Sequence, residues 1–304
     1  MPVMIQALLP VFVLILLGYF FRRWHFPGGD FWPQAERFTY YVLFPAMLIF
    51  KLGQAQVPAS AYGDILILIV AMLAVMTLLL VALQWFWRWP GPVFSSVFQG
   101  SIRFNSYVAL ATAGMLLGDD GLSLIAIAVA VKVPLLNLLC ILMFSVVAGQ
   151  GAVKLKPVFK AVVSNPLIIG SVVGMFWSYF QIGFHPLVAG ILEPLSDLAL
   201  PLGLMTVGAG LQIKALRGAS MPFLVSSVAK LVGFPLLTAG LALLLGLEGM
   251  MVQVAILLAA LPTATSSYIL ARQLGGDAPL MAGIISGQTL LAMVTIPLLL
   301  GILW

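Results

Sequence analysis

Long apolar stretches constrain the fold of this 304-residue chain more than any other feature. A transmembrane helix needs about 20 consecutive, mostly apolar residues. With only 8% charged residues, the chain cannot cover this much apolar surface in water, which excludes a soluble enzyme and a nucleic-acid-binding protein. We therefore predict an all-α polytopic membrane protein embedded in a lipid bilayer. The ten predicted spans are residues 5–21, 38–53, 64–87, 93–117, 122–148, 160–182, 195–212, 221–246, 250–272 and 279–303.

The distribution of Lys and Arg predicts the orientation of these spans. The loops after spans 1, 3, 5, 7 and 9 hold ten basic residues, whereas the other loops and both termini hold Lys51 alone. Because cytoplasmic loops carry the excess of Lys and Arg, both termini are expected outside, in a multi-pass protein of the cell (inner) membrane. The basic segment 149–160, which joins the two halves, is then expected to be cytoplasmic.

The two halves of the chain share landmarks in one register. Each half holds five predicted spans, so the second half enters the membrane from the opposite side. We predict a first five-helix repeat in residues 1–150 and a second, inverted repeat in residues 151–304, with scaffold and transport bundles each drawn from both. This is a recurrent architecture of secondary transporters. The landmark pairs are Pro10 and Pro166, Gly18 and Gly174, and Pro45 and Pro201, all 156 residues apart, and Gly118-Asp119-Asp120 with Gly275-Gly276-Asp277, 157 apart.

Both repeats carry a predicted helix break at corresponding places. Span 9 contains Pro262, which removes a helix hydrogen bond, followed by five small residues up to Ser267. Span 4 contains Gly100 and Asn105 in the corresponding stretch, and Asn105 aligns with Pro262 at the offset of 157. We expect helices 4 and 9 to be broken and to cross near the membrane midplane, where the N-termini of half-helices favour anions. A simple proline kink, with Ser and Thr bonded back to the helix, is the alternative.

Three basic residues lie within predicted spans, namely Arg103, Lys132 and Lys230. No Asp or Glu lies near the middle of any span. Charges inside a membrane usually face a cavity or a partner, so an anionic substrate such as a carboxylate would neutralise them, and a guanidinium matches a carboxylate with two parallel hydrogen bonds. Each of the three has an alternative role. The Arg103 guanidinium could instead reach the cytoplasmic interface. Lys132 could carry a coupling proton or bond to helix-end carbonyl groups, and Lys230 could tie its helix to a neighbouring one.

These patterns favour a secondary transporter of small organic anions that works by alternating access. The sequence lacks a phosphate-binding loop and the motifs of intramembrane proteases, so we expect neither an enzyme nor a bound cofactor or metal. An anion-selective channel or uniporter and a sodium-coupled symporter remain alternatives, and protons or sodium remain open as coupling ions. The candidate substrate-binding residues are Arg103, Asn105, Ser106, Lys132, Asn137, Pro262, Thr263, Thr265, Ser266 and Gln288, with Gly100, Asn105 and Pro262 as the helix-breaking residues. For Asn137 and Gln288, contacts between helices are the alternative role.

Several short motifs together resemble the auxin efflux carrier family of membrane permeases. They are Leu8-Leu9-Pro10-Val11-Phe12-Val13-Leu14-Ile15-Leu16-Leu17-Gly18-Tyr19, Tyr40-Tyr41-Val42-Leu43-Phe44-Pro45-Ala46, Asn165-Pro166-Leu167-Ile168-Ile169, Ala260-Leu261-Pro262-Thr263-Ala264 with Gly275-Gly276-Asp277, and Thr295-Ile296-Pro297-Leu298-Leu299. The resemblance implies ten helices in two inverted repeats with crossed helices 4 and 9, a carboxylate substrate such as malonate or malate, and, by family analogy only, a homodimer.

One departure from the family pattern lies in span 4. The family's motif there reads Arg-x-Asn-x-Gly and is followed by Leu-Pro. Arg103 and Asn105 match it, but Tyr107 replaces the glycine and no proline follows. The departure leaves open how sharply span 4 is broken and which substrate fits.

Overall fold

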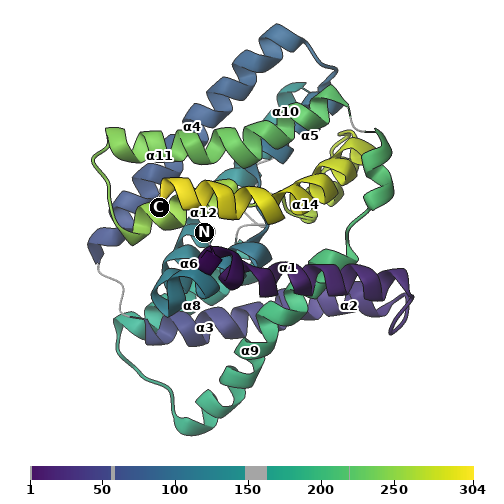
Figure 1. The fold of residues 1–304 in the computed structure, drawn as a ribbon. Coiled ribbons are helices and arrows are strands. Elements are labelled where there is room, and N and C mark those ends of the chain that lie inside the picture. The colour runs from purple at the N-terminus through teal and green to yellow at the C-terminus, as the bar shows by residue number, and fades with distance from the viewer. Residues whose placement is uncertain (1, 56–58, 148–162, 219) are drawn as a thin grey trace.

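The computed structural model describes residues 2–55, 59–147, 163–218 and 220–304, and every regular element among them is helical (Figure 1). The elements are α1 (Pro2–Arg23), α2 (Phe31–Phe38), η1 (Thr39–Leu43), α3 (Phe44–Gln54), α4 (Ala59–Trp87), α5 (Gly91–Ile102), α6 (Ser106–Val147), α8 (Pro166–Tyr179), α9 (Pro186–Ala209), η2 (Ile213–Gly218), α10 (Met221–Val228), η3 (Ala229–Gly233), α11 (Phe234–Leu244), α12 (Met250–Ala260), α13 (Ser266–Gln273) and α14 (Ala278–Leu303).

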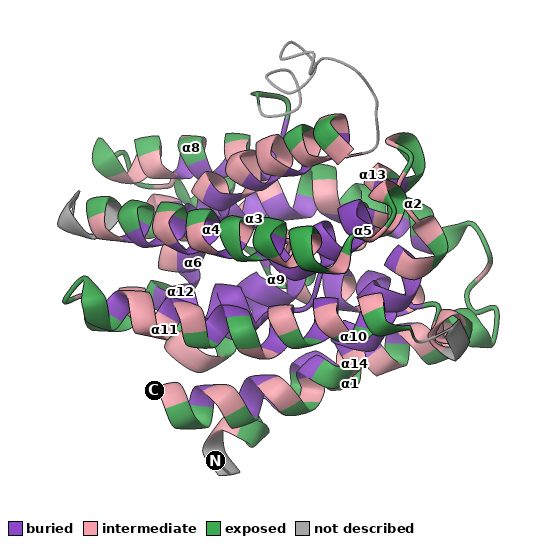
Figure 2. Ribbon diagram, turned by 90° about the horizontal axis from the view of Figure 1, so that it is seen from above, coloured by how far each residue is buried: buried purple, intermediate pink, exposed green. Residues whose placement is uncertain are grey.

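The architecture is that of a polytopic membrane protein. Among the described residues, six helical stretches are long and apolar enough to cross a membrane, and α8 and α12 are shorter apolar helices. Large apolar side chains also cover the outer surface; Leu78 is 68% exposed and Leu243 is 82% exposed. Figure 2 shows the buried residues where helices face one another and the exposed ones on the outward sides. Lipid accommodates such a surface, whereas water does not, so the chain is an integral membrane protein. The count of ten spans stays a prediction.

Two helices begin earlier along the chain than the sequence predicts. The second helical stretch runs without interruption from Phe31 through α2, η1 and α3, seven residues before the predicted start at residue 38. Helix α9 begins at Pro186 rather than at residue 195. Pro186 occupies the first helical position and His185 Nδ1 accepts a hydrogen bond from Leu187 N (3.3 Å), which is a typical helix start.

Helices α1, α3, α8 and α9 pack on one another in the lower half of Figure 1. Glycines allow this close approach. A Cβ atom at Gly18 would lie 1.9 Å from the carbonyl oxygen of Met205, and one at Gly174 would lie 2.7 Å from that of Leu48. Gly18 and Gly174 are a predicted repeat pair, and each holds its helix against the opposite half of the chain. The packing of α1 on α9 and of α8 on α3 is thus reciprocal, while the repeat itself stays a prediction.

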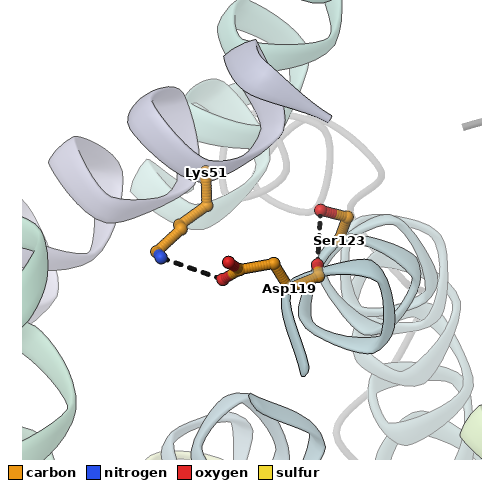
Figure 3. Close-up of polar contacts among 3 residues, drawn as sticks. All are labelled: Lys51, Asp119 and Ser123. Atoms are coloured by element: carbon orange, nitrogen blue, oxygen red, sulfur yellow. Dashed lines mark hydrogen bonds and ion pairs between the residues drawn. The ribbon is translucent and has the colours of Figure 1, made fainter. Parts of the chain in front are cut away.

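Most of the remaining helices form a second group, in which α6 packs on α4, α5 and α12, whereas α2 and η1 pack on α9. Gly118, with φ of +67°, kinks α6 and divides it into the helices predicted as spans 4 and 5. Next to the kink, Lys51 Nζ at the end of α3 donates to Asp119 Oδ1 (2.9 Å; Figure 3). The start of α1 and the end of α14 lie near each other in both views (Figures 1 and 2). Which side of the membrane they occupy stays a prediction.

Candidate functional site

Two helix breaks meet at the centre of the molecule. Helix α5 ends at Ile102 and α6 begins at Ser106, while α12 ends at Ala260 and α13 begins at Ser266. The backbone between them is extended at Arg103 (φ −72°, ψ 158°) and at Leu261 (φ −69°, ψ 146°). Asn105 N donates to the carbonyl oxygen of Pro262 over 2.8 Å. The two non-helical segments therefore contact each other directly.

Different local signals produce the two breaks. Pro262 cannot donate a backbone hydrogen bond, which ends α12. In span 4 the break needs no proline, because Asn105 caps α6: its Oδ1 accepts from Tyr107 N (3.0 Å) and from Val108 N (3.3 Å). Tyr107, which stands where the family pattern has glycine, stacks on Phe44 with ring centroids 4.7 Å apart. Gly100 lies inside α5, two residues before its end.

A buried hydrogen-bond network ties the crossover to α14. Gln288 Oε1 accepts from Thr263 N (3.0 Å) and lies 2.7 Å from Thr263 Oγ1. Gln288 Nε2 donates to the carbonyl oxygen of Gly100 (2.9 Å), which also lies 2.7 Å from Thr263 Oγ1. Thr263 and Gln288 are both 0% exposed. This network joins elements from both halves of the chain and satisfies backbone groups that the two breaks leave free.

Beside the crossover lies a cavity of about 530 Å³. Arg103 lines it and makes two hydrogen bonds there, from Nη1 to Asn137 Oδ1 (3.1 Å) and from Nη2 to Ser266 Oγ (3.1 Å). Arg103 Nε has no hydrogen-bond partner. Within the part of the chain that the structure describes, the one ion pair is Lys51–Asp119, so the Arg103 guanidinium has no carboxylate partner. Six candidate residues line the cavity: Arg103, Asn105, Ser106, Asn137, Thr265 and Ser266.

The other four candidates lie outside the lining of this cavity. Thr263 and Gln288 belong to the buried network, and Pro262 is buried at the break itself. Lys132 is 0% exposed and donates to the carbonyl oxygen of Leu258 (3.3 Å). The structure therefore divides the candidates between the cavity and the packed core beside it.

Several cavity residues were not among the sequence candidates. Most come from α2, η1 and the start of α8, which the sequence places far from the two breaks, whereas Tyr107 and Gln273 belong to α6 and α13, which follow the breaks. Glu36 and Thr265 also line a second cavity of about 180 Å³. There Thr265 Oγ1 donates to Glu36 Oε1 (3.4 Å). The unpredicted polar residues that line the larger cavity are Glu36, Arg37, Tyr40, Tyr41, Tyr107, Asn165 and Gln273.

Three helix N-termini face the larger cavity. Ser106 begins α6, Ser266 begins α13, and Asn165 precedes α8, and all three residues line the cavity. Asn165 caps α8: its Oδ1 accepts from Leu167 N (2.9 Å). A helix N-terminus carries a positive partial charge, which adds to the charge of Arg103. The cavity lining thus combines the positive charges of Arg103 and Arg37 and three helix N-termini with one carboxylate, that of Glu36.

Comparison with known proteins finds similar chains among membrane transporters. Residues 150–300 match the family model described as "Membrane transport protein". A "Putative malonate transporter" of Rhizobium meliloti is 27% identical over 305 residues, which cover 95% of this chain and 92% of that protein. An "Uncharacterized transporter" of Methanothermobacter thermautotrophicus is 24% identical over 298 residues, 96% of each chain. Over its second half the chain is thus similar to the auxin efflux carrier-type membrane transport family, and over nearly its whole length to these two transporters.

Proposed function

We propose that the protein is a secondary transporter of small organic anions, with a dicarboxylate such as malonate as the first substrate to test. The observation that carries this proposal is the Arg103 guanidinium, which lines a cavity of about 530 Å³ without a carboxylate partner. A charge within a membrane protein needs neutralising. A substrate carboxylate supplies the missing negative charge.

The polar groups around Arg103 suit a carboxylate. The guanidinium holds donors in a planar fork that matches two carboxylate oxygens, and its Nη1 and Nη2 atoms donate to the neutral side chains of Asn137 and Ser266. Ser266 Oγ accepts from Arg103, so its hydroxyl proton is available to the substrate. The N-termini of α6, α8 and α13 add positive partial charge. The name of the Rhizobium meliloti relative supports malonate as the probe.

The lining of the cavity supports alternating access. Arg37 on α2 and Gln273 at the end of α13 line one side of the cavity, next to loops that we predict to be cytoplasmic. The buried Thr263–Gln288 network and the Phe44–Tyr107 stack lie behind the crossover. In this proposal the described conformation is the cytoplasm-facing state, and transport requires a second state in which the cavity opens outward.

The test is thermal unfolding of the purified protein with malonate, malate, succinate, indole acetate and amino acids, at two pH values, with and without sodium. A ligand at about 100 times its Kd stabilises the folded state by about 2.7 kcal/mol. We expect stabilisation by a carboxylate, with affinity reduced about 10- to 100-fold in Arg103→Gln because two charge-assisted bonds are lost. Arg272→Gln, an exposed α13 arginine outside the cavity lining, is the matched control. Stabilisation only by cations or neutral solutes contradicts the proposal.

A further inference from the structure

Two buried lysines share one aromatic ring beside the crossover. Lys132 on α6 and Lys230 on η3 place their Nζ atoms 4.9 Å and 4.8 Å from the ring centroid of Phe234. Lys132 Nζ also lies 4.9 Å from the ring centroid of Phe104. Both lysines are 0% exposed, and neither lines either cavity described above. Lys230 sits in a π-helical turn, a feature that often marks functional sites.

The two amino groups have little to neutralise them. Lys132 Nζ donates to the carbonyl oxygen of Leu258, whereas Lys230 Nζ has no hydrogen-bond partner. The phenyl ring of Phe234 offers a weak attraction to one ammonium, and two ammonium groups on the same ring repel each other. A buried charge without an anionic partner is costly, and a lysine escapes this cost by releasing its proton.

The elements packed around Lys230 bring no other titratable side chain. Helices α5, α10, α11, α12 and α14 contain no Asp, Glu, Lys, Arg, His, Cys or Tyr within their bounds. Lys132 is the titratable group that faces Lys230 from α6. The helices packed against α6 carry titratable residues near their ends or on other faces, and α6 carries four of its own. These are Tyr19, Arg22, Arg23, Lys51, Tyr62, Asp64, Tyr179, Glu193 and Asp197 on the neighbouring helices, and Tyr107, Asp119, Asp120 and Cys140 on α6.

Lys132 contacts both helix breaks. Phe104 stands between Arg103 and Asn105 in the first break, stacks against Lys132 and lines the substrate cavity. Leu258, which accepts the hydrogen bond from Lys132, lies on α12 shortly before the second break. A change of charge on Lys132 therefore acts on the two segments that hold the proposed substrate, through one ring and one carbonyl group.

We propose that the Lys132–Lys230 pair binds the single proton that couples anion transport to a proton gradient, an inference that rests on the proposed function. In the loaded state one lysine is an ammonium and the other a neutral amine; in the unloaded state both are amines. The proton enters from water on one side of the membrane and leaves to water on the other, so no further reactant is needed. The packed surroundings of the pair suit a proton, because it occupies no volume of its own.

The experiment uses the full-length protein in liposomes and two assays. The first measures exchange of labelled malonate at equal pH on both sides, which needs no net proton movement. The second measures net malonate accumulation driven by a pH gradient with the membrane potential clamped. A gradient of one pH unit drives about tenfold accumulation for each coupled proton. We expect wild-type protein to be active in both assays.

The variants distinguish a role of the positive charge of the two lysines from a role of proton release. Lys132→Arg and Lys230→Arg keep a permanent positive charge, because arginine does not release its proton, and the double variant Lys132→Met/Lys230→Met cannot bind a proton at either position. We expect all three to exchange malonate and to lose gradient-driven accumulation. Lys214→Arg, a matched change at an exposed lysine of η2, should keep both activities. Size-exclusion chromatography identifies the folded variants, and one folded variant at either position suffices.

Two results would overturn the inference while the proposed function stands. One is gradient-driven accumulation retained by a folded Lys132 or Lys230 variant, which would place the proton elsewhere, for example on the substrate. The other is exchange without gradient-driven accumulation in the wild-type protein. Absence of malonate exchange in the wild-type protein, with no other carboxylate active, would overturn the proposed function and this inference with it.

Discussion

Replacing Gln288 by Leu tests whether the buried network holds the crossover together. The variant removes the acceptor of the Thr263 backbone N–H and the donor to the Gly100 carbonyl oxygen, within a site where both side chains are 0% exposed. An unpaired buried N–H costs about 1–3 kcal/mol, and an interhelical hydrogen bond in a membrane protein contributes about 0.6 kcal/mol on average. We therefore expect a loss of about 2–3 kcal/mol in the free energy of unfolding.

Thr263→Val is the matched comparison at the same network. It removes one hydroxyl group at nearly constant volume, while the Thr263 N–H keeps Gln288 Oε1 and the Gly100 carbonyl oxygen keeps Gln288 Nε2. Because no buried group is left unpaired, the expected loss is only about 1 kcal/mol. Equilibrium unfolding in mixed detergent micelles measures both values. Equal losses in the two variants, or a loss under about 1 kcal/mol for Gln288→Leu, would refute the reasoning.

Three further changes test other parts of the structure. Asn105→Ala removes the cap of α6, so it should cost about 1 kcal/mol of stability and abolish malonate-induced stabilisation. Asn105→Ser keeps a capping hydroxyl and should preserve stability. Equal stability of the two variants in thermal unfolding would contradict the capping role. Gly18→Leu should prevent recovery of monodisperse protein by size-exclusion chromatography, because its Cβ would lie 1.9 Å from a carbonyl oxygen of α9, whereas Gly240→Leu, with no atom within 4 Å, should be tolerated. Lys51→Gln breaks an ion pair whose side chains are 33% and 79% exposed, so a double-mutant cycle with Asp119→Asn should give a coupling energy under about 1 kcal/mol.

Local sequence signals were enough to locate the two breaks. Pro262 cannot continue a helix, and Asn105 is a strong helix cap, so the interruptions of spans 9 and 4 follow from neighbouring residues alone. Arg103 could be singled out because a charge within an apolar stretch has few explanations.

The rest of the cavity depends on packing between distant segments. Glu36, Tyr40 and Asn165 lie at helix ends, and only the packing of α2, η1 and α8 against the crossover brings them to the cavity. Thr263 and Gln288 illustrate the opposite case, since their polarity predicted substrate contacts but they bond to each other. A single sequence does not distinguish a polar side chain that faces a cavity from one that pairs with a side chain 25 positions away in the sequence.

The hydrogen bond from Asn105 N to the Pro262 carbonyl oxygen has a mechanical consequence. Because it joins one break to the other, and Gln288 ties both to α14, independent hinging of the two interrupted helices would leave buried backbone groups unpaired. We therefore expect the two helices to move as one rigid body. The moving boundary then lies between this body and the group formed by α1, α3, α8 and α9, and the cavity lining comes from both sides of it. We expect the transport cycle to be a single relative displacement of the two bodies, which paired spin labels across the boundary would record as one correlated change in distance.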